Sequence, residues 1–366
     1  MTNGYRVAVV GATGVVGRTV LRVLEERADR FPVADLVPFA SPRSVGTPIP
    51  FRDKHLLCRA LDPEAVEGFH LVFSSAGGEI SLEWAEQFAR HGAVVIDKSS
   101  AFRTYENEPY HVPLVVPQVN PDAASLAFGE QGRRIIATPN CSTTQLVVAL
   151  KPLLDVAPIA RLVIATYQAV SGTGQRAVDE LGRETRELIE TPDKAPKTEV
   201  YPHQIAFNAL PEAGTFLDDG RTDEEEKLRY ETKRILGQPD IRISATCVRV
   251  PVATCHSEAI NIEFDKAVGP TEIRERLEAA DGVVVADDPG SHTYPLAIDA
   301  AGKDDVFVGR IRQDPDCNRA IDLWVVADNL RKGAATNAVE IAELLHKEGL
   351  LPAQRGHSDS REPLHA

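Results

Sequence analysis

The first 27 residues carry the pattern that most restricts the fold. The apolar run YRVAVV is followed by GATGVVG and then by RTVLRVLEER, whose apolar residues recur at helical spacing. Gly11, Gly14 and Gly17 fall between strand and helix, where glycine permits a tight turn and lets the backbone approach a pyrophosphate. The pattern therefore predicts a dinucleotide-binding strand, turn and helix. Because the spacing is GxxGxxG instead of GxGxxG, a tight turn without a ligand is the alternative.

Strands and helices continue to alternate through the first 140 residues. Further strands are expected at 33–40, 70–75, 93–98 and 133–138, with a helix over 81–92. This alternation implies a mostly parallel sheet, since parallel neighbours need crossover connections. We therefore expect a Rossmann-type α/β domain over residues 1–140.

The pattern changes after residue 140. Long strands are expected at 161–170, 241–252, 257–264, 306–313 and 321–329, and amphipathic helices at 175–190 and 222–236. These elements predict an α+β catalytic and dimerisation domain over residues 141–329, with a larger, mainly antiparallel sheet. A helix over 333–349 is expected to return to the first domain, and residues 352–366 to form a flexible tail.

Composition limits where the protein works and what it binds. No apolar run approaches the roughly 20 residues that span a bilayer. The five cysteines are odd in number and lack CxxC spacing, which argues against a disulfide framework and a zinc site and predicts a cytoplasmic protein without a metal. The formal charge of −14 disfavours nucleic acid and anionic membranes as partners. An anionic substrate would therefore need a locally basic site.

The end of the second expected strand indicates which dinucleotide is bound. Enzymes that use NAD usually place an acidic residue there, about 20 residues beyond the glycine turn. Here Ser41, Arg43 and Ser44 offer hydroxyls and a guanidinium suited to a 2′-phosphate, and Asp35 falls inside the strand. The sequence thus favours NADP over NAD, the alternative being that Arg43 is a solvated loop charge.

One cysteine stands out from the other four. Cys141 lies in TPNCSTTQLVVAL, directly before an expected helix. A helix N-terminus favours the thiolate and lowers the thiol pKa, so Cys141 is predicted to attack carbonyl groups near neutral pH. Cys58, Cys247 and Cys317 are expected to be inert.

Five motifs together resemble the aspartate-β-semialdehyde dehydrogenase family. They are GATGVVG, SSAFR (99–103), PNCST (139–143), YQAVSGTG (167–174) and RVPVATCH (249–256). The resemblance implies Cys141 as nucleophile, His256 as acid/base and Gln168 as the residue that orients the intermediate. For the substrate it implies Arg249 for the α-carboxylate, Glu224 for the amino group, Arg103 and Lys227 for phosphate, and also Asn140. For the cofactor it implies Gly11, Thr13, Gly14, Val15, Val16, Gly17, Ser41, Arg43, Ser44, Ser171, Gly172 and Asn329.

The family's reaction is the implied activity. It is the reversible, NADP-dependent reductive dephosphorylation of L-4-aspartyl phosphate to L-aspartate 4-semialdehyde through a cysteine thioester, on the route to lysine, threonine, methionine and isoleucine. A homodimer without a metal is implied as well. The alternatives are an N-acetyl-glutamyl-phosphate reductase, against which PNCST argues because that family resembles PGCYPT at this site, and a noncatalytic NADP-binding paralogue.

Some residues leave other interpretations open. Glu224 and Lys227 could form only a surface ion pair, and His256 could be an ordinary hydrogen-bonded histidine. Two positions depart from the family pattern: PEAGTF (211–216), and Cys255, where glycine is common. These departures put in question the local loop geometry and the environment of His256.

Overall fold

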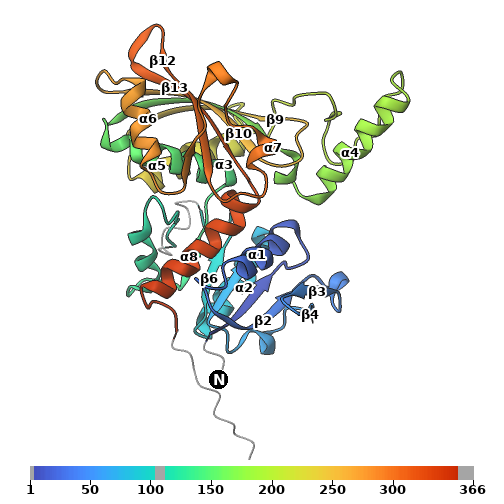
Figure 1. The fold of residues 1–366 in the computed structure, drawn as a ribbon. Coiled ribbons are helices and arrows are strands. Elements are labelled where there is room, and N and C mark those ends of the chain that lie inside the picture. Colours follow the sequence, from blue (N-terminus) through green and yellow to red (C-terminus); the bar gives the residue numbers. More distant parts are fainter. Residues whose placement is uncertain (1–3, 104–111, 353–366) are drawn as a thin grey trace, which may run out of the picture.

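The computed structural model describes residues 4–103 and 112–352 (Figure 1). Most of the segment predicted to be a flexible tail, residues 353–366, lies outside the described residues. Within the described part, no helix is long and apolar enough to cross a membrane.

The N-terminal region contains a five-stranded parallel sheet in the order β2-β1-β5-β6-β7. Its strands are β1 (Tyr5–Val10), β2 (Val33–Phe39), β5 (Leu71–Ser74), β6 (Val94–Asp97) and β7 (Ile135–Ala137). Helix α2 (Gly78–Arg90) covers one face, and α1 (Val15–Glu26) and α8 (Thr336–Lys347) cover the other. The strand order changes direction between β1 and β5, the point where open α/β sheets bind their ligands. The predicted Rossmann-type domain is confirmed.

The second region is built on a six-stranded sheet in the order β11-β12-β13-β10-β8-β9. Its strands are β8 (Ile159–Gln168), β9 (Arg242–Arg249), β10 (His256–Phe264), β11 (Val283–Val285), β12 (Val306–Asp314) and β13 (Cys317–Ala327). The three central pairings are antiparallel, but both edge pairings, β11 with β12 and β8 with β9, are parallel. The sheet is therefore mixed, because long crossovers return β9 and β12 in the direction of their neighbours.

Helices pack on one face of this second sheet. They are α3 (Cys141–Leu150), α5 (Asp223–Leu236) and α6 (Pro270–Glu278). Helix α4 (Gln175–Glu190) projects away from the body, as Figure 1 shows, and α7 (Ala297–Ala300) is a single turn beside β13. The expected helices at 175–190 and 222–236 correspond to α4 and α5.

Several short elements have no counterpart in the sequence prediction. The hairpin of β3 (Pro48–Phe51) and β4 (Lys54–Leu57) contains two prolines, which weaken a strand pattern. The short helices, of three to eight residues, are too short to show a clear period. These short helices are η1 (Pro42–Ser44), η2 (Pro63–Val66), η4 (Pro121–Phe128), η5 (Lys151–Asp155), η6 (Val170–Gly172), η7 (Pro289–Ser291) and η8 (Arg331–Ala335), the last a π-helix.

The two regions are joined through a shared apolar core. One buried cluster runs from Phe88 of α2 through Leu146 of α3 to Ile260 of β10. Helix α8 returns to the first sheet, where Ile341 and Leu345 pack with α1 and β1. Figure 1 shows α8, in red, lying against the blue N-terminal region. The carboxyl end of the parallel sheet therefore faces the start of α3.

Candidate active site

The glycine turn leaves the start of α1 open to an anion. Gly11 has φ +78°, and a Cβ on Gly17 would lie 2.3 Å from the Gly11 carbonyl oxygen, so both positions require glycine. The helix begins after Gly14 without a side-chain cap and has no acidic residue in its first turn. Thr13 lies in the turn, and Val15 and Val16 are the first residues of α1. The N–H groups of the first turn of α1 therefore fit the pyrophosphate of a dinucleotide.

The residues predicted to select NADP follow β2 at its carboxyl end. Ser41 precedes η1, which contains Arg43 and Ser44, and the Arg43 side chain is exposed. Asp35 lies within β2 and pairs with Arg6 at 3.1 Å. The acidic side chain is thus engaged away from the strand end, and a guanidinium and two hydroxyls remain there for a 2′-phosphate.

Cys141 is the first residue of α3, and Asn140 caps this helix. The Asn140 side-chain oxygen accepts the backbone N–H of Ser142 at 2.9 Å, and its Nδ2 donates to Glu224 at 2.8 Å. A Cβ on Gly333 would lie 2.8 Å from the Cβ of Cys141, so the π-helix η8 packs directly on the cysteine. Asn140 therefore holds the loop that carries Cys141 through its side chain.

His256 begins β10 and is fully buried. Its Nδ1 accepts the backbone N–H of Ala169 at 3.0 Å, whereas its Nε2 has no hydrogen-bond partner among the described residues. Burial, with the cations Arg249 and Lys98, holds the pKa of His256 well below its usual value, so the ring is neutral. Because Nδ1 accepts a hydrogen bond, the ring proton lies on Nε2. His256 thus offers an N–H donor to a ligand.

Arg249 and Gly172 lie beside this imidazole. The buried Arg249 donates from Nη1 to the Ala169 carbonyl at 2.8 Å. A Cβ on Gly172 would lie 3.1 Å from that Nη1 and 3.2 Å from the His256 Nε2. The absence of a side chain at Gly172 therefore keeps space open in front of both a guanidinium and an imidazole.

Glu224 connects the loop that carries Cys141 to Gln168 at the end of β8. Its Oε1 accepts from Asn140 at 2.8 Å and from Gln168 Nε2 at 3.2 Å, and its Oε2 lies 3.6 Å from Lys227 Nζ. Lys227 also donates to Asp223 at 2.6 Å. Burial lowers the pKa of Lys227, but Glu224 and Asp223 together raise it by more. The net shift is upward, so this lysine stays charged. Glu224 and Lys227 are therefore not merely a surface ion pair.

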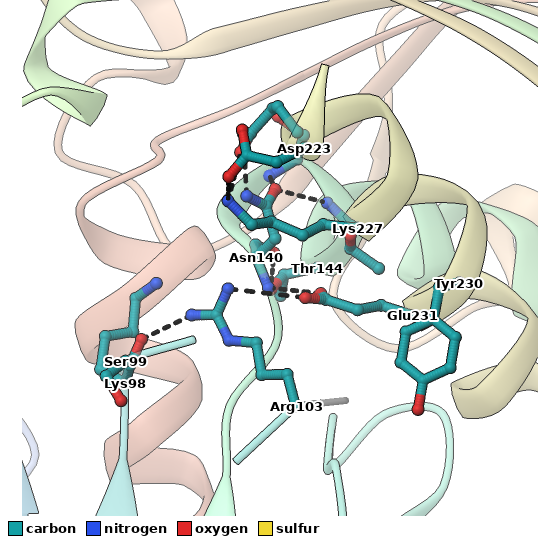
Figure 2. Close-up of polar contacts among 12 residues, drawn as sticks. Lys98, Ser99, Arg103, Asn140, Thr144, Asp223, Lys227, Tyr230 and Glu231 are labelled. Atoms are coloured by element: carbon teal, nitrogen blue, oxygen red, sulfur yellow. Dashed lines mark hydrogen bonds and ion pairs between the residues drawn. The ribbon is translucent and has the colours of Figure 1, made fainter. Parts of the chain in front are cut away.

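Arg103 forms the opposite side of the same cluster (Figure 2). It is buried, its Nη2 donates to the Lys98 carbonyl, and its Nη1 lies 3.5 Å from Oε1 of the fully buried Glu231. Glu231 also accepts the backbone N–H of Asn140 at 2.6 Å through Oε2. The guanidinium is thus tied to the loop that carries Cys141.

Ser171, Asn329 and Cys255 form a neighbouring network. Asn329 bonds to the Ser171 hydroxyl at 3.0 Å, and its Oδ1 accepts the Cys255 N–H at 2.9 Å. Cys255 has φ +76°, a region that glycine adopts most readily, which explains why glycine suits this position. Asn329 therefore fixes the turn that precedes His256 although a cysteine stands there.

The other departure, PEAGTF, packs on the start of α5. Thr215 N–H donates to the Asp223 carboxylate at 2.8 Å, and a Cβ on Gly214 would lie 2.0 Å from the same carboxylate. Leu210 pairs through its backbone with Arg249. The altered loop thus hydrogen-bonds to the start of α5, and the residue directly before it pairs with the strand that bears Arg249.

The predicted lowering of the Cys141 pKa is wrong. Burial raises this pKa, as does the nearby Glu224, while Lys98, Arg249 and Arg103 act in the opposite direction. Desolvation of the thiolate outweighs the favourable helix start. The thiol is therefore largely protonated at neutral pH. All five cysteines are free.

Sequence reasoning missed two charged residues of this cluster. Glu231 lies seven residues after Glu224 and thus on the same face of α5, a spacing that could have identified it. Lys98 directly follows β6 at the carboxyl end of the parallel sheet, which is the usual position for ligand-binding groups.

Comparisons with known proteins agree with this arrangement. The family "Semialdehyde dehydrogenase, NAD binding domain" matches residues 6–127, and "Semialdehyde dehydrogenase, dimerisation domain" matches residues 150–332. A protein from Aquifex aeolicus named aspartate-semialdehyde dehydrogenase is 53% identical over 349 residues, covering 95% of this chain and 100% of the relative.

Two solved structures resemble the whole chain. Aspartate semialdehyde dehydrogenase II from Vibrio cholerae, complexed with ASA, has a TM-score of 0.89 at 43% identity and covers 94% of this chain and 99% of its own. Aspartate semialdehyde dehydrogenase with NADP from Candida albicans has a TM-score of 0.71 at 25% identity and covers 95% of this chain and 100% of its own.

Proposed function

The chain belongs to the aspartate-semialdehyde dehydrogenase family, and we propose that it interconverts L-4-aspartyl phosphate and L-aspartate 4-semialdehyde with NADP as cofactor. One observation carries the proposal. A cysteine at a helix start lies in one buried cluster with an imidazole N–H, two arginines and a lysine that stays charged. These groups suit covalent attack on a small anionic aldehyde. Biosynthesis of lysine, threonine, methionine and isoleucine is the role that follows from this reaction.

The chain's own residues account for the first half of the chemistry. Gly11, Gly14 and Gly17 would hold the pyrophosphate, and Arg43 the 2′-phosphate. When bound, NADP supplies the acceptor for the hydride that leaves the substrate carbon. Once the thiol proton has left to solvent, the Cys141 thiolate adds to the aldehyde carbon and forms a C–S bond. The carbonyl oxygen becomes an oxyanion that accepts a hydrogen bond from the His256 Nε2–H, so that loss of hydride from this adduct gives the thioester directly. His256 acts here as a donor to oxygen and does not take the thiol proton.

Substrate and phosphate are held from opposite sides. Arg249 pairs with the α-carboxylate through two parallel hydrogen bonds, and Glu224, oriented by Asn140 and Gln168, accepts from the amino group. Loss of hydride leaves a thioester on Cys141. Phosphate bound by Arg103 and Lys227 attacks the thioester carbonyl, the C–S bond breaks, and the thiolate is restored.

A substrate comparison tests this function. Purified protein with NADP and phosphate should form NADPH rapidly with aspartate semialdehyde and at background rate with N-acetyl-glutamate semialdehyde. The reverse preference would support the reductase alternative. Activity with neither compound, together with retained NADP binding, would support a noncatalytic paralogue.

We further propose that the second sheet's outer face binds another copy of the chain. Tyr167 and Trp324 lie there with ring centroids 5.4 Å apart. Trp324 lines a hollow of about 470 Å³ together with Tyr294 and Leu296. These four side chains are partly exposed, and the matching family description for residues 150–332 names a dimerisation domain. Sedimentation equilibrium should therefore give twice the chain's mass. The five free cysteines suit the cytoplasm that we propose as the location.

A further inference from the structure

Lys98 lies beside the nucleophile because of how the parallel sheet ends. Asp97 of β6 pairs in register with Ala137 of β7, and the N–H of Thr138 donates to the Asp97 carbonyl at 2.8 Å. Lys98 therefore follows one strand at the level where the chain leading to Cys141 follows the next. Two adjacent strand ends thus bring a lysine and a cysteine to the same edge of the sheet.

The Lys98 side chain is partly buried and lies beside the charged cluster. Figure 2 shows Lys98 next to the Arg103 guanidinium, which donates to the Lys98 carbonyl. In the described part of the chain, no carboxylate forms an ion pair with the Lys98 ammonium. A cation without a carboxylate partner is free to interact with other anions in the cluster.

We propose that Lys98 is a further functional cation of this site, which stabilises the Cys141 thiolate electrostatically. The inference rests on Cys141 being the nucleophile. Lys98 is then a third cation, besides Arg249 and Arg103, whose charge favours the thiolate form of Cys141. No hydrogen bond joins the Lys98 ammonium to the Cys141 sulfur atom in the described part of the chain, so Lys98 acts on the thiolate through its electric field.

The neighbouring charges determine when Lys98 carries its charge. The pKa of Lys98 is lowered to about 8, chiefly by burial and secondly by Arg103, on the segment after β6. Cys141 at the start of α3, and Glu224 and Glu231 on α5, act in the opposite direction.

Two further groups complete this electrostatic environment. Lys98 contributes to the depressed pKa of His256 on β10, and Arg249 on β9 acts on the same histidine and on Cys141. Lys98 is therefore protonated below about pH 8 and loses its charge above it.

Two alkylating agents of different charge can detect this cation. Iodoacetate is an anion and iodoacetamide is neutral, so the ratio of their rates at one thiol reports the local potential, because thiol ionisation cancels from the ratio. The rates at Cys141 are measured by peptide mapping in the full chain. Cys317, the other partly exposed cysteine, serves as an internal control.

Lys98→Met should lower the iodoacetate-to-iodoacetamide ratio at Cys141 by about 5- to 10-fold at pH 7 and leave the ratio at Cys317 unchanged. Lys98→Arg should keep the ratio high, and loss of the exposed lysine in Lys54→Met should have no effect. In the unmodified protein the ratio should fall as pH rises through about 8. In Lys98→Arg this fall should disappear.

Two results would overturn the proposal. One is an unchanged ratio in Lys98→Met while both alkylation rates fall together, which would mean that Lys98 only supports the fold. The other is a fall with pH that persists in Lys98→Met, which would assign the titration to a group other than Lys98. Neither readout uses turnover, so failure of the proposed reaction would appear separately, in the substrate assay.

Discussion

The cofactor turn and the reaction site meet at one edge of the parallel sheet but are built in different ways. The turn is formed by consecutive residues and recognises its ligand with backbone N–H groups, and its glycines are required by φ and by close backbone contacts. The reaction site gathers side chains from α3, α5, β8, β9, β10 and the segment after β6. A substitution in the turn should therefore affect mainly the turn and cofactor binding, whereas a substitution in the reaction site should disturb several side chains at once.

The largest effect is expected from the nucleophile itself. Cys141→Ala should reduce turnover by on the order of 10⁶-fold, because no other group can form the thioester. NADP affinity should survive, since the glycine turn belongs to the other region. Equilibrium binding measured beside steady-state rates would check both parts. Retained turnover in the variant would contradict the covalent mechanism, and loss of NADP binding would contradict the separation of the two regions.

Substitutions of the two arginines should slow different steps of the reaction. Arg249→Lys keeps the charge but loses the planar fork that aligns the substrate, so the first-turnover burst of NADPH should slow by on the order of 100-fold. Arg103→Lys should retain its burst and show a raised phosphate KM, because phosphate enters only after hydride loss.

Stopped-flow measurements separate these steps. If both arginine variants lose the burst equally, the two arginines form one shared anion site. The link from Arg103 through Glu231 to Asn140 would then couple them.

A single methyl group tests the cofactor turn. Gly17→Ala would place its Cβ 2.3 Å from the Gly11 carbonyl oxygen, so it should destabilise the fold by about 1–3 kcal/mol and weaken NADP binding. The matched control is Gly182→Ala on α4, where the added Cβ would meet no other part of the described structure within 4 Å. Because alanine favours a helix more than glycine does, the free energy of unfolding should rise by about 0.5–1 kcal/mol. Urea denaturation of both variants would show the difference. Equal effects at the two glycines would contradict the close backbone packing of the turn.

The smallest effect is expected at Arg43. This side chain is exposed, so Arg43→Ala should reduce the preference for NADP over NAD by about tenfold, the lower end for a charge-assisted contact. The kcat/KM values for both cofactors give the ratio. An unmodified enzyme that uses NAD and NADP equally well would remove the basis for this assignment.

The same contrast explains what the sequence could predict. The strand, turn and helix around Gly11 and Gly17 depend on neighbouring residues, and their pattern predicts both element types and the kind of ligand. Cys141 was distinguished by its place at a helix start. Arg249, Glu224 and His256 could be assigned only through family resemblance, since their roles depend on contacts between distant segments.

Other features depend on three-dimensional surroundings that no local pattern encodes. The raised pKa of Cys141 follows from burial that outweighs the helix start. The mixed character of the second sheet follows from where the crossovers return β9 and β12. The position of Glu231 on the face of α5 that bears Glu224 can be read from spacing, but its contact with Asn140 and the contact of Arg103 with Lys98 depend on how α5 and the end of β6 meet in the fold.

The most direct test of the account is a rapid-mixing experiment with aspartate semialdehyde and NADP in the absence of phosphate. We expect a burst of NADPH equal to the active-site concentration, then little further reaction, with the acyl group found on the Cys141 peptide by mass spectrometry. Phosphate added afterwards should release the acyl group and start steady turnover. Continuous NADPH formation without phosphate, or an acyl group on any other residue, would contradict a Cys141 thioester that is cleaved by phosphate.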